Sequence, residues 1–176
     1  MADNSPANHI HPACVREEVL LLDCDVTRSR VGGPGGQHRN KVETAISILH
    51  RPTSISASAS ERRSQEQNRR MAVFRLRLAL AVEHRCIRSA EVNPSEIWKQ
   101  RCRNQKISCA DKHQDFASML AEAMDAVFSK DGDVRRAAAA LSCSTTQLTR
   151  FLGRVPEALE RVNGLREEFG LRRLRV

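Results

Sequence analysis

The chain has 176 residues and a formal net charge of +8, with 40% hydrophobic and only 3% aromatic residues. This length fits one medium domain or two small ones with thin cores. The scarcity of aromatic side chains excludes a surface of stacked rings, as in many single-strand binders, so a nucleic-acid contact must rely on charge and backbone groups.

The charge is distributed unevenly along the chain. Val26 to Ala110 carries 17 Lys and Arg against 6 Asp and Glu, a net +11, whereas the other residues carry 12 against 15, a net −3. Arginine predominates, and its planar fork suits bidentate phosphate contacts. A basic half beside a mildly acidic half indicates that one part contacts a polyanion; the alternative is a solvated basic face that serves solubility.

The cysteine spacing predicts no metal site, and the apolar runs predict no membrane-spanning segment. None of the six cysteines forms a C-x-x-C pair, so we predict no metal site. The polar N-terminus has no signal-peptide core, and no run of about 18 apolar residues could span a bilayer. We expect a cytoplasmic protein with reduced thiols and no membrane partner.

The first elements are expected to form a small sheet. Residues 1–8 are predicted to be a disordered tail, and Val19 to Val26 a strand that turns polar towards its end. After a glycine-rich loop, Asn40 to Glu43 is a possible polar turn of helix. Ala45–His50 and Ile55–Ala59 alternate around a proline-containing turn, which predicts a β-hairpin whose Ser/Ala-rich second strand lies at an edge.

A long helix is predicted to follow the hairpin. Ser60 is a reasonable N-cap, and the helical pattern continues to about Arg85. Four residues at spacings of three and four are expected to form its apolar stripe against the sheet: Met71, Phe74, Leu78 and Val82.

The rest of the chain is predicted to be mainly helical. A turn at Asn93–Glu96 starts a short helix anchored by Ile97 and Trp98, and Lys99 to Lys106 is expected to be a basic connector. Further helices are predicted around a stripe of Phe116, Leu120, Met124, Val127 and Phe128, then over Val134–Ala140, Thr145–Leu152 and from Pro156 to about Phe169, which Gly170 ends.

The glycine-rich loop is the strongest candidate for chemistry. Gly32 to Gln37 holds four glycines and a proline in six residues, and glycine allows another molecule's backbone to approach closely. A flexible turn is one alternative. A phosphate-cradling loop is another, but the segment matches neither of its fingerprints, G-x-x-x-x-G-K-[ST] or G-x-G-x-x-G before a long helix.

Two spaced motifs resemble one known family. Arg28 to Lys41, with Gly35-Gly36-Gln37, resembles the GGQ loop of class I peptide chain release factors and of the smaller ribosome-rescue hydrolases. Downstream, Arg63-Ser64-Gln65 with Asn68 resembles the R-S-Q-x-x-N segment that opens the long helix of the same domain. Gly32 and Arg39 depart from the family, which usually has serine and a small apolar residue there.

The resemblance implies an enzyme that hydrolyses the ester joining a nascent peptide to tRNA, with the large ribosomal subunit's RNA and peptidyl-tRNA as partners and with no cofactor. Gly35 and Gly36 would shape the approach to the ester. The backbone N–H of Gln37 would stabilise developing charge, and its side chain would orient or exclude nucleophiles. The chain has no G-x-S-x-G nucleophile motif, as expected if ribosomal RNA and the tRNA ribose supply much of the site.

Twelve residues around these motifs are expected to bind RNA. For three of them, Ser64, Gln65 and Asn68, hydrogen bonding at the start of the helix is an equal alternative. The full set is Arg28, Arg30, His38, Arg39, Asn40, Lys41, Arg62, Arg63, Ser64, Gln65, Asn68 and Arg69.

The fold class implied by the resemblance and the element order is α+β: a small β-sheet with a packed long helix, followed by an all-α domain with a helix-turn-helix-like unit. The expected divisions are 9–88 for the GGQ domain, 89–110 for a basic linker with a short helix, and 111–176 for the helical domain. A chain of this length leaves no room for stop-codon-reading domains, so codon-independent rescue on stalled ribosomes or large subunits is expected.

The helical part leaves an alternative open. In a nucleic-acid-binding regulator the residues facing bases would be Thr145, Thr146, Gln147, Thr149 and Arg150. The net charge of −3 outside the basic stretch argues against an autonomous DNA binder. A helical packing unit, or a unit that docks a protein partner, is the other interpretation.

Overall fold

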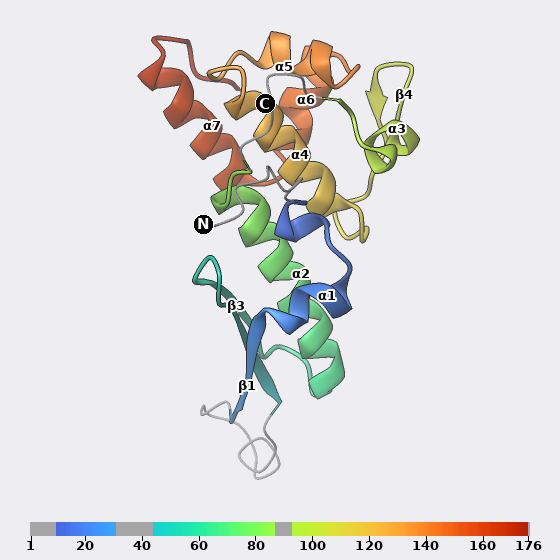
Figure 1. The fold of residues 1–176 in the computed structure, drawn as a ribbon, viewed down its shortest axis with the longest axis vertical. Coiled ribbons are helices and arrows are strands. Elements are labelled where there is room, and N and C mark those ends of the chain that lie inside the picture. The colour runs from blue at the N-terminus through green and yellow to red at the C-terminus, as the bar shows by residue number, and fades with distance from the viewer. Residues whose placement is uncertain (1–9, 31–43, 87–92, 176) are drawn as a thin grey trace, which may run out of the picture.

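The computed structural model describes residues 10–30, 44–86 and 93–175. A three-stranded antiparallel sheet lies at one end of the molecule, a group of helices lies at the other, and the long helix α2 (Gln65–Glu83) runs between them (Figure 1). The α+β fold class is confirmed. The predicted tail over residues 1–8 and the turn at Asn40–Glu43 lie outside the described residues.

The sheet has the strand order β1-β2-β3. β1 (Cys24–Ser29) pairs with β2 (Ala45–His50), and β2 pairs with β3 (Ile55–Ala59), which confirms the predicted hairpin and its edge strand. Ile46, Ile48 and Ala59 are buried towards α2, as period-two alternation requires of a sheet with one covered face.

The predicted strand over Val19–Val26 is wrong in its first half. Glu17–Leu22 forms a short helix, α1, and the strand begins only at Cys24. Leu20 is buried while Leu22 is 75% exposed, so the apolar run presents one helical face to the core. Glu17 and Glu18 in the first turn favour this helix through its N-terminal partial charge.

The start and the apolar face of α2 also differ from the prediction. The N-cap is Ser64, not Ser60, and its hydroxyl accepts the Gln67 N–H. The most buried positions include Val73, Leu76 and Leu80, whereas Met71, Phe74 and Leu78 are only half-buried. The reason is that α2 packs against the sheet on one side and against α4 on another, so its buried surface is wider than one stripe.

The segment expected as a basic connector is ordered. Helix α3 (Glu96–Arg101), capped by Ser95 and anchored by the fully buried Trp98, matches the predicted short helix. It leads directly into a two-stranded hairpin, β4 (Cys102–Arg103) and β5 (Lys106–Ile107). Asn104 and Gln105 both have positive φ (48° and 60°), which is the geometry of a two-residue hairpin turn.

The remaining helices match the predicted order. They are α4 (Phe116–Phe128), α5 (Val134–Ala140), α6 (Thr145–Leu152) and α7 (Pro156–Glu168), with a 3₁₀ turn η1 (Pro12–Cys14) near the N-terminus. α4 is buried on all sides from Phe116 to Val127 because η1, α2, α5, α6 and α7 surround it. Its apolar surface is therefore broader than the predicted stripe.

One hydrophobic core runs through both halves of the molecule. It includes Ile48 of the sheet, Leu76 and Leu80 of α2, and Met119 and Leu148 of the helical group. Among the described residues, no helix is long and apolar enough to cross a membrane.

Candidate functional site

The glycine-rich segment is anchored at the free end of the sheet. Ser29, the last residue of β1, pairs with Ala45, the first residue of β2. The flanking residues Arg30 and Thr44 therefore adjoin two strand ends that lie side by side. This end lies away from the helical group (Figure 1). The predicted site residues of the segment itself lie outside the described residues: Gly35, Gly36, Gln37, His38, Arg39, Asn40 and Lys41.

Asn68 fastens the downstream root of this segment to α2. Its side chain is completely buried. Its Nδ2 donates to the Thr44 carbonyl at 2.6 Å and to the Arg62 carbonyl at 2.9 Å, and its Oδ1 accepts the Arg62 N–H at 2.8 Å. Asn68 therefore joins three pieces of backbone: the residue before β2, the β3–α2 connection and the first turn of α2. Its predicted contact with RNA stays a prediction, and the observed contacts give it a positioning role.

The other downstream motif residues lie at the start of the same helix. Ser64 is the N-cap of α2 and Gln65 its first residue. Arg62 and Arg63 are exposed in the connection just before the cap. Arg69 lies one turn into the helix, half-buried, with Nη1 3.5 Å from a carboxylate oxygen of Glu17. These cations surround the N-terminus of α2, whose first backbone N–H groups also favour anions.

Arg28 and Arg30 carry the positive charge to the upstream root. Arg28 lies near the end of β1, opposite Ile46, and Arg30 follows the strand; both are exposed. The structure thus brings eight of the predicted RNA-binding residues to the two roots of the glycine-rich segment and the adjoining helix start: Arg28, Arg30, Arg62, Arg63, Ser64, Gln65, Asn68 and Arg69. The arrangement suits phosphate binding around the end of the sheet where β1 ends and β2 begins.

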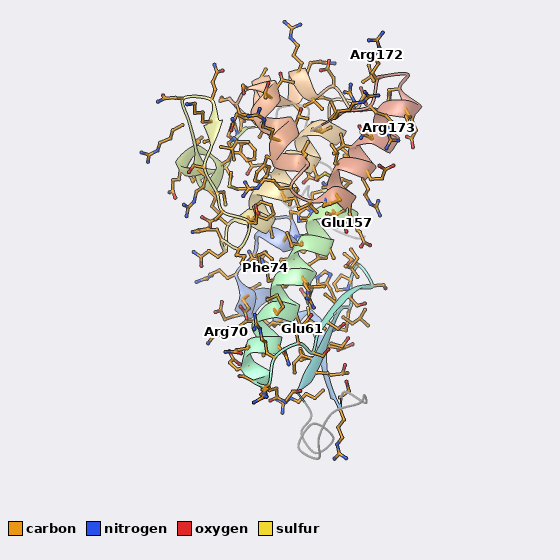
Figure 2. The ribbon with its side chains drawn as sticks, turned by 180° about the vertical axis from the view of Figure 1, so that it is seen from behind. Glu61, Arg70, Phe74, Glu157, Arg172 and Arg173 are labelled. Atoms are coloured by element: carbon orange, nitrogen blue, oxygen red, sulfur yellow. The ribbon has the colours of Figure 1, made fainter. Side chains whose placement is uncertain are left out.

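A cavity of about 800 Å³ opens beside α2, and no motif or spacing in the sequence indicates it. Phe74 and Met71 of α2 contribute apolar surface to it, and Arg62, Arg70 and Lys112 contribute charge. Arg70 and Phe74, four residues apart, lie on the same side of α2 (Figure 2).

A second group of polar residues lies where α2 meets α4. His11, Cys86 and Asp125 place possible metal-ligand atoms within 4.8 Å of one another. His11 Nδ1, however, accepts the Ala13 N–H at 3.1 Å, and His11 Nε2 lies 3.1 Å from the His84 carbonyl. The Arg85 guanidinium donates to Asp125 at 2.8 Å, which neutralises the carboxylate. A cation would have to displace these contacts, so they favour a structural junction.

The helix-turn-helix-like unit is formed by α5 and α6, but one of its proposed base-reading residues is engaged. The side-chain oxygen of Gln147 accepts the Ile107 N–H at 3.2 Å. The β4–β5 hairpin docks on the α5–α6 turn, where Gln105 O accepts the Ser144 N–H. These contacts favour the packing interpretation of α6 at Gln147.

The comparisons with known proteins agree with this geometry. A family model described as the RF-1 domain matches residues 17–119. Peptide chain release factor PrfB1, chloroplastic, of Arabidopsis thaliana is 39% identical over 93 residues, which are 49% of this chain and 20% of that protein. Peptide chain release factor 1 of Caldicellulosiruptor bescii is 40% identical over 78 residues, 44% of this chain and 22% of the relative. The chain thus spans about a fifth of the length of these curated relatives.

Proposed function

Because the chain belongs to the RF-1 domain family, we propose that it hydrolyses the peptidyl-tRNA ester on the ribosome and so releases the nascent peptide. The observation that carries this proposal is the anchoring of the segment containing Gly35, Gly36 and Gln37. Its two roots leave the sheet side by side, and Asn68 clamps the second root to a basic helix start. The chemistry requires such a rigid, cationic mount for a loop that reaches into an RNA-walled site.

In the proposed mechanism the protein contributes position and hydrogen bonds rather than a nucleophile. The water oxygen attacks the ester carbonyl carbon, and the bond to the tRNA ribose oxygen breaks. The ribose oxygen takes a proton from the water, and the peptide leaves as an acid. The Gln37 N–H would donate to the oxygen on which negative charge develops, and Gly35 and Gly36 would allow the backbone to come close enough. Loss of one such donor raises a barrier by about 3–4 kcal/mol.

The proposed partners are the RNA of the large subunit and peptidyl-tRNA. Arg28, Arg30, Arg62 and Arg63 would contact phosphates around the loop. The proposed divisions are 9–88 for the GGQ domain, 89–110 for the linker and 111–176 for the helical part, which would dock a protein partner.

We further propose that release by this chain is independent of the codon, as in ribosome rescue. The support is that α4 to α7 pack as a helical group against α2 and one another. Within the described parts of the chain, this group lies at the end opposite the tip from which the glycine-rich segment departs (Figure 1).

The test is peptide release from purified ribosome complexes that carry labelled peptidyl-tRNA. Three substrates are compared: a stop codon in the A site, a sense codon, and mRNA truncated at the P site. We expect release on truncated mRNA, and a Gln37→Pro variant, which lacks the backbone N–H, that binds ribosomes but releases peptide at least about a hundredfold more slowly. Gln100→Ala, an exposed glutamine on α3, is the control.

Release that is unchanged in Gln37→Pro, or absent on all three substrates although the protein co-sediments with ribosomes, would refute the enzymatic proposal. Release only with a stop codon would refute codon independence while leaving hydrolysis in place.

A further inference from the structure

The cavity beside α2 combines an apolar floor with a positive rim. Its floor includes Met71, Phe74 and the α4 residue Ala117, and its volume of about 800 Å³ lies within the range of small-molecule sites. Four of its lining residues are cationic and one, Glu17, is acidic, so the lining carries a net charge of +3. The cavity is therefore suited to an anion that also has an apolar or flat part.

Neutral groups hold the positive charge of Arg77 in the wall, whereas the lining residue Arg70 is paired with Glu66 at 3.0 Å. Arg77 is half-buried, and its guanidinium donates to the Ala13 carbonyl at 3.1 and 2.9 Å, to the Val15 carbonyl at 3.3 Å and to Ser118 Oγ at 3.3 Å. These acceptors orient the side chain without cancelling its charge. The acidic residue of the lining, Glu17, already faces Arg69 at 3.5 Å.

The rim is linked to the mount of the glycine-rich segment. Arg62, a rim residue, is the one whose backbone N–H and carbonyl both bond Asn68, and Asn68 also binds Thr44 at the root of the segment. Lys112 and Gln114 line the same cavity from the connection that precedes α4. A ligand in this cavity would touch both the helix start and the helical group.

We propose that this cavity binds one unstacked nucleotide of RNA, with its base against Phe74 and Met71 and its phosphate at Arg62, Arg70 or Lys112. This inference rests on the proposed function, because that function places RNA beside the start of α2. Single-stranded RNA is commonly recognised by stacking of a splayed base on an aromatic ring together with cationic contacts to the backbone. An aromatic-poor protein gains such a contact here from a single phenylalanine.

The test uses NMR titration of the full-length ¹⁵N-labelled protein with four probes: the hexaribonucleotide A6, 5′-AMP, adenosine and inorganic phosphate. We expect A6 to shift the amides of residues 70–77 and 112–117, and to bind at least tenfold more tightly than AMP. Adenosine and phosphate are each expected to bind more weakly than AMP. If AMP matches A6, the RNA source is overturned in favour of a free nucleotide. If phosphate matches AMP, or the shifts lie elsewhere, the site is overturned.

Variants separate this site from general charge. Lys112→Glu is expected to weaken A6 binding at least tenfold, and Phe74→Leu, which keeps an apolar side chain, at least threefold. Lys106→Glu makes the same charge change on the exposed β5 strand, away from the cavity lining, and is expected to change binding less than twofold. Equal losses in Lys112→Glu and Lys106→Glu would overturn the proposal.

The two proposals fail in different ways. Gln37→Pro is expected to keep A6 binding while it loses peptide release. If the wild-type protein releases peptide but Lys112→Glu leaves A6 binding unchanged, the proposed function stands and the nucleotide site is refuted. If Lys112→Glu weakens A6 binding but the wild-type protein never releases peptide, the nucleotide site stands and the proposed function is refuted.

Discussion

Replacing Asn68 by aspartate changes one buried NH₂ group into an oxygen while leaving the shape of the side chain intact. The two bonds donated to the Thr44 and Arg62 carbonyls, at 2.6 and 2.9 Å, are lost, and an acceptor then faces two acceptors. A carbonyl left out of water without its donor costs about 1–3 kcal/mol. Water can replace the donor at the exposed Arg62, so we count only the Thr44 carbonyl and expect a loss of about 1–3 kcal/mol. For a chain of this size that lowers Tm by about 2–12 °C.

Circular dichroism melts at several pH values test this reasoning. Burial raises the pKa of an aspartate at this position, because the folded protein disfavours the charged form. The folded variant therefore keeps its proton to a higher pH than the unfolded chain does, and its deficit relative to wild type grows as pH rises above about 4. At a pH of about 4.5 a protonated carboxyl can still donate one bond, so the deficit is smaller there than at a pH of about 8.

Gln67→Glu makes the same amide-to-acid change one residue earlier, on an exposed side chain. We expect it to change Tm by less than about 2 °C, since exposed substitutions usually alter stability by under about 0.5 kcal/mol. If Asn68→Asp melts as Gln67→Glu does, or if its deficit shrinks as pH rises, the clamp does not have the role assigned to it. Slower peptide release by Asn68→Asp at a temperature where it remains folded would link the clamp to function.

Further outcomes follow from buried titratable groups. Burial lowers the pKa of His50 and of His84 below the ordinary value of 6.5, so the unfolded chain binds protons first and the free energy of unfolding should fall as pH drops from about 7.5 through 6.5. Urea unfolding at several pH values should show this decrease, and it should be smaller in the double variant His50→Gln, His84→Gln. Burial raises the pKa of Cys143 to about 12. At a pH of about 8 its thiolate fraction is then about a thousandth of that of a thiol with the ordinary pKa of 9.0, so iodoacetamide should modify Cys143 far more slowly in the native protein than in guanidinium, as mass spectrometry would show. Equal labelling rates, or a slope that the double variant keeps, would contradict these assignments.

The elements that the sequence predicted are those with local signals. Ser95, Asp133 and Ser144 cap α3, α5 and α6 with their own side chains, and Pro156 opens α7. Each signal lies within a few residues of the element that it starts, so no knowledge of packing is needed. The same holds for the β2–β3 hairpin, where alternation alone marks both strands.

The elements that were missed depend on contacts between distant residues. The four-residue apolar run before Asp23 is too short for its period to distinguish a helix from a strand. Ser60 and Ser64 can both cap a helix; Asn68, which holds the Arg62 backbone, makes Ser64 the cap. The β4–β5 turn has no glycine, and its docking on Ser144 is not visible from the local sequence.

The candidate site divides in the same way. The GGQ and R-S-Q-x-x-N motifs are read directly from the sequence, but their connection through Thr44 is not, because Asn68 and Thr44 are 24 residues apart. Arg77 illustrates the same limit: it lies outside the apolar stripe predicted for α2, yet it bonds Ala13, which is 64 residues away. Charged residues on a helix are usually exposed, so sequence periodicity assigns such residues to the surface.

The junction of α2 and α4 determines whether the two halves of the molecule fold together. Arg85 and Asp125 are 21% and 1% exposed, and the guanidinium also lies 5.3 Å from the centre of the Phe128 ring. Removing one partner of a buried pair costs about 3–5 kcal/mol, so Asp125→Asn should lower Tm by about 6–20 °C. Asp25→Asn breaks the exposed pair with Arg51, in which Arg51 is 49% and Asp25 56% exposed, and should cost at most about 1 kcal/mol. Because the core is continuous from the sheet to the helical group, we expect the Asp125→Asn loss to move a single transition, seen equally by circular dichroism and by the fluorescence of Trp98. Two separate transitions, with only one of them shifted, would show that the helical half folds independently of the half that carries the glycine-rich segment.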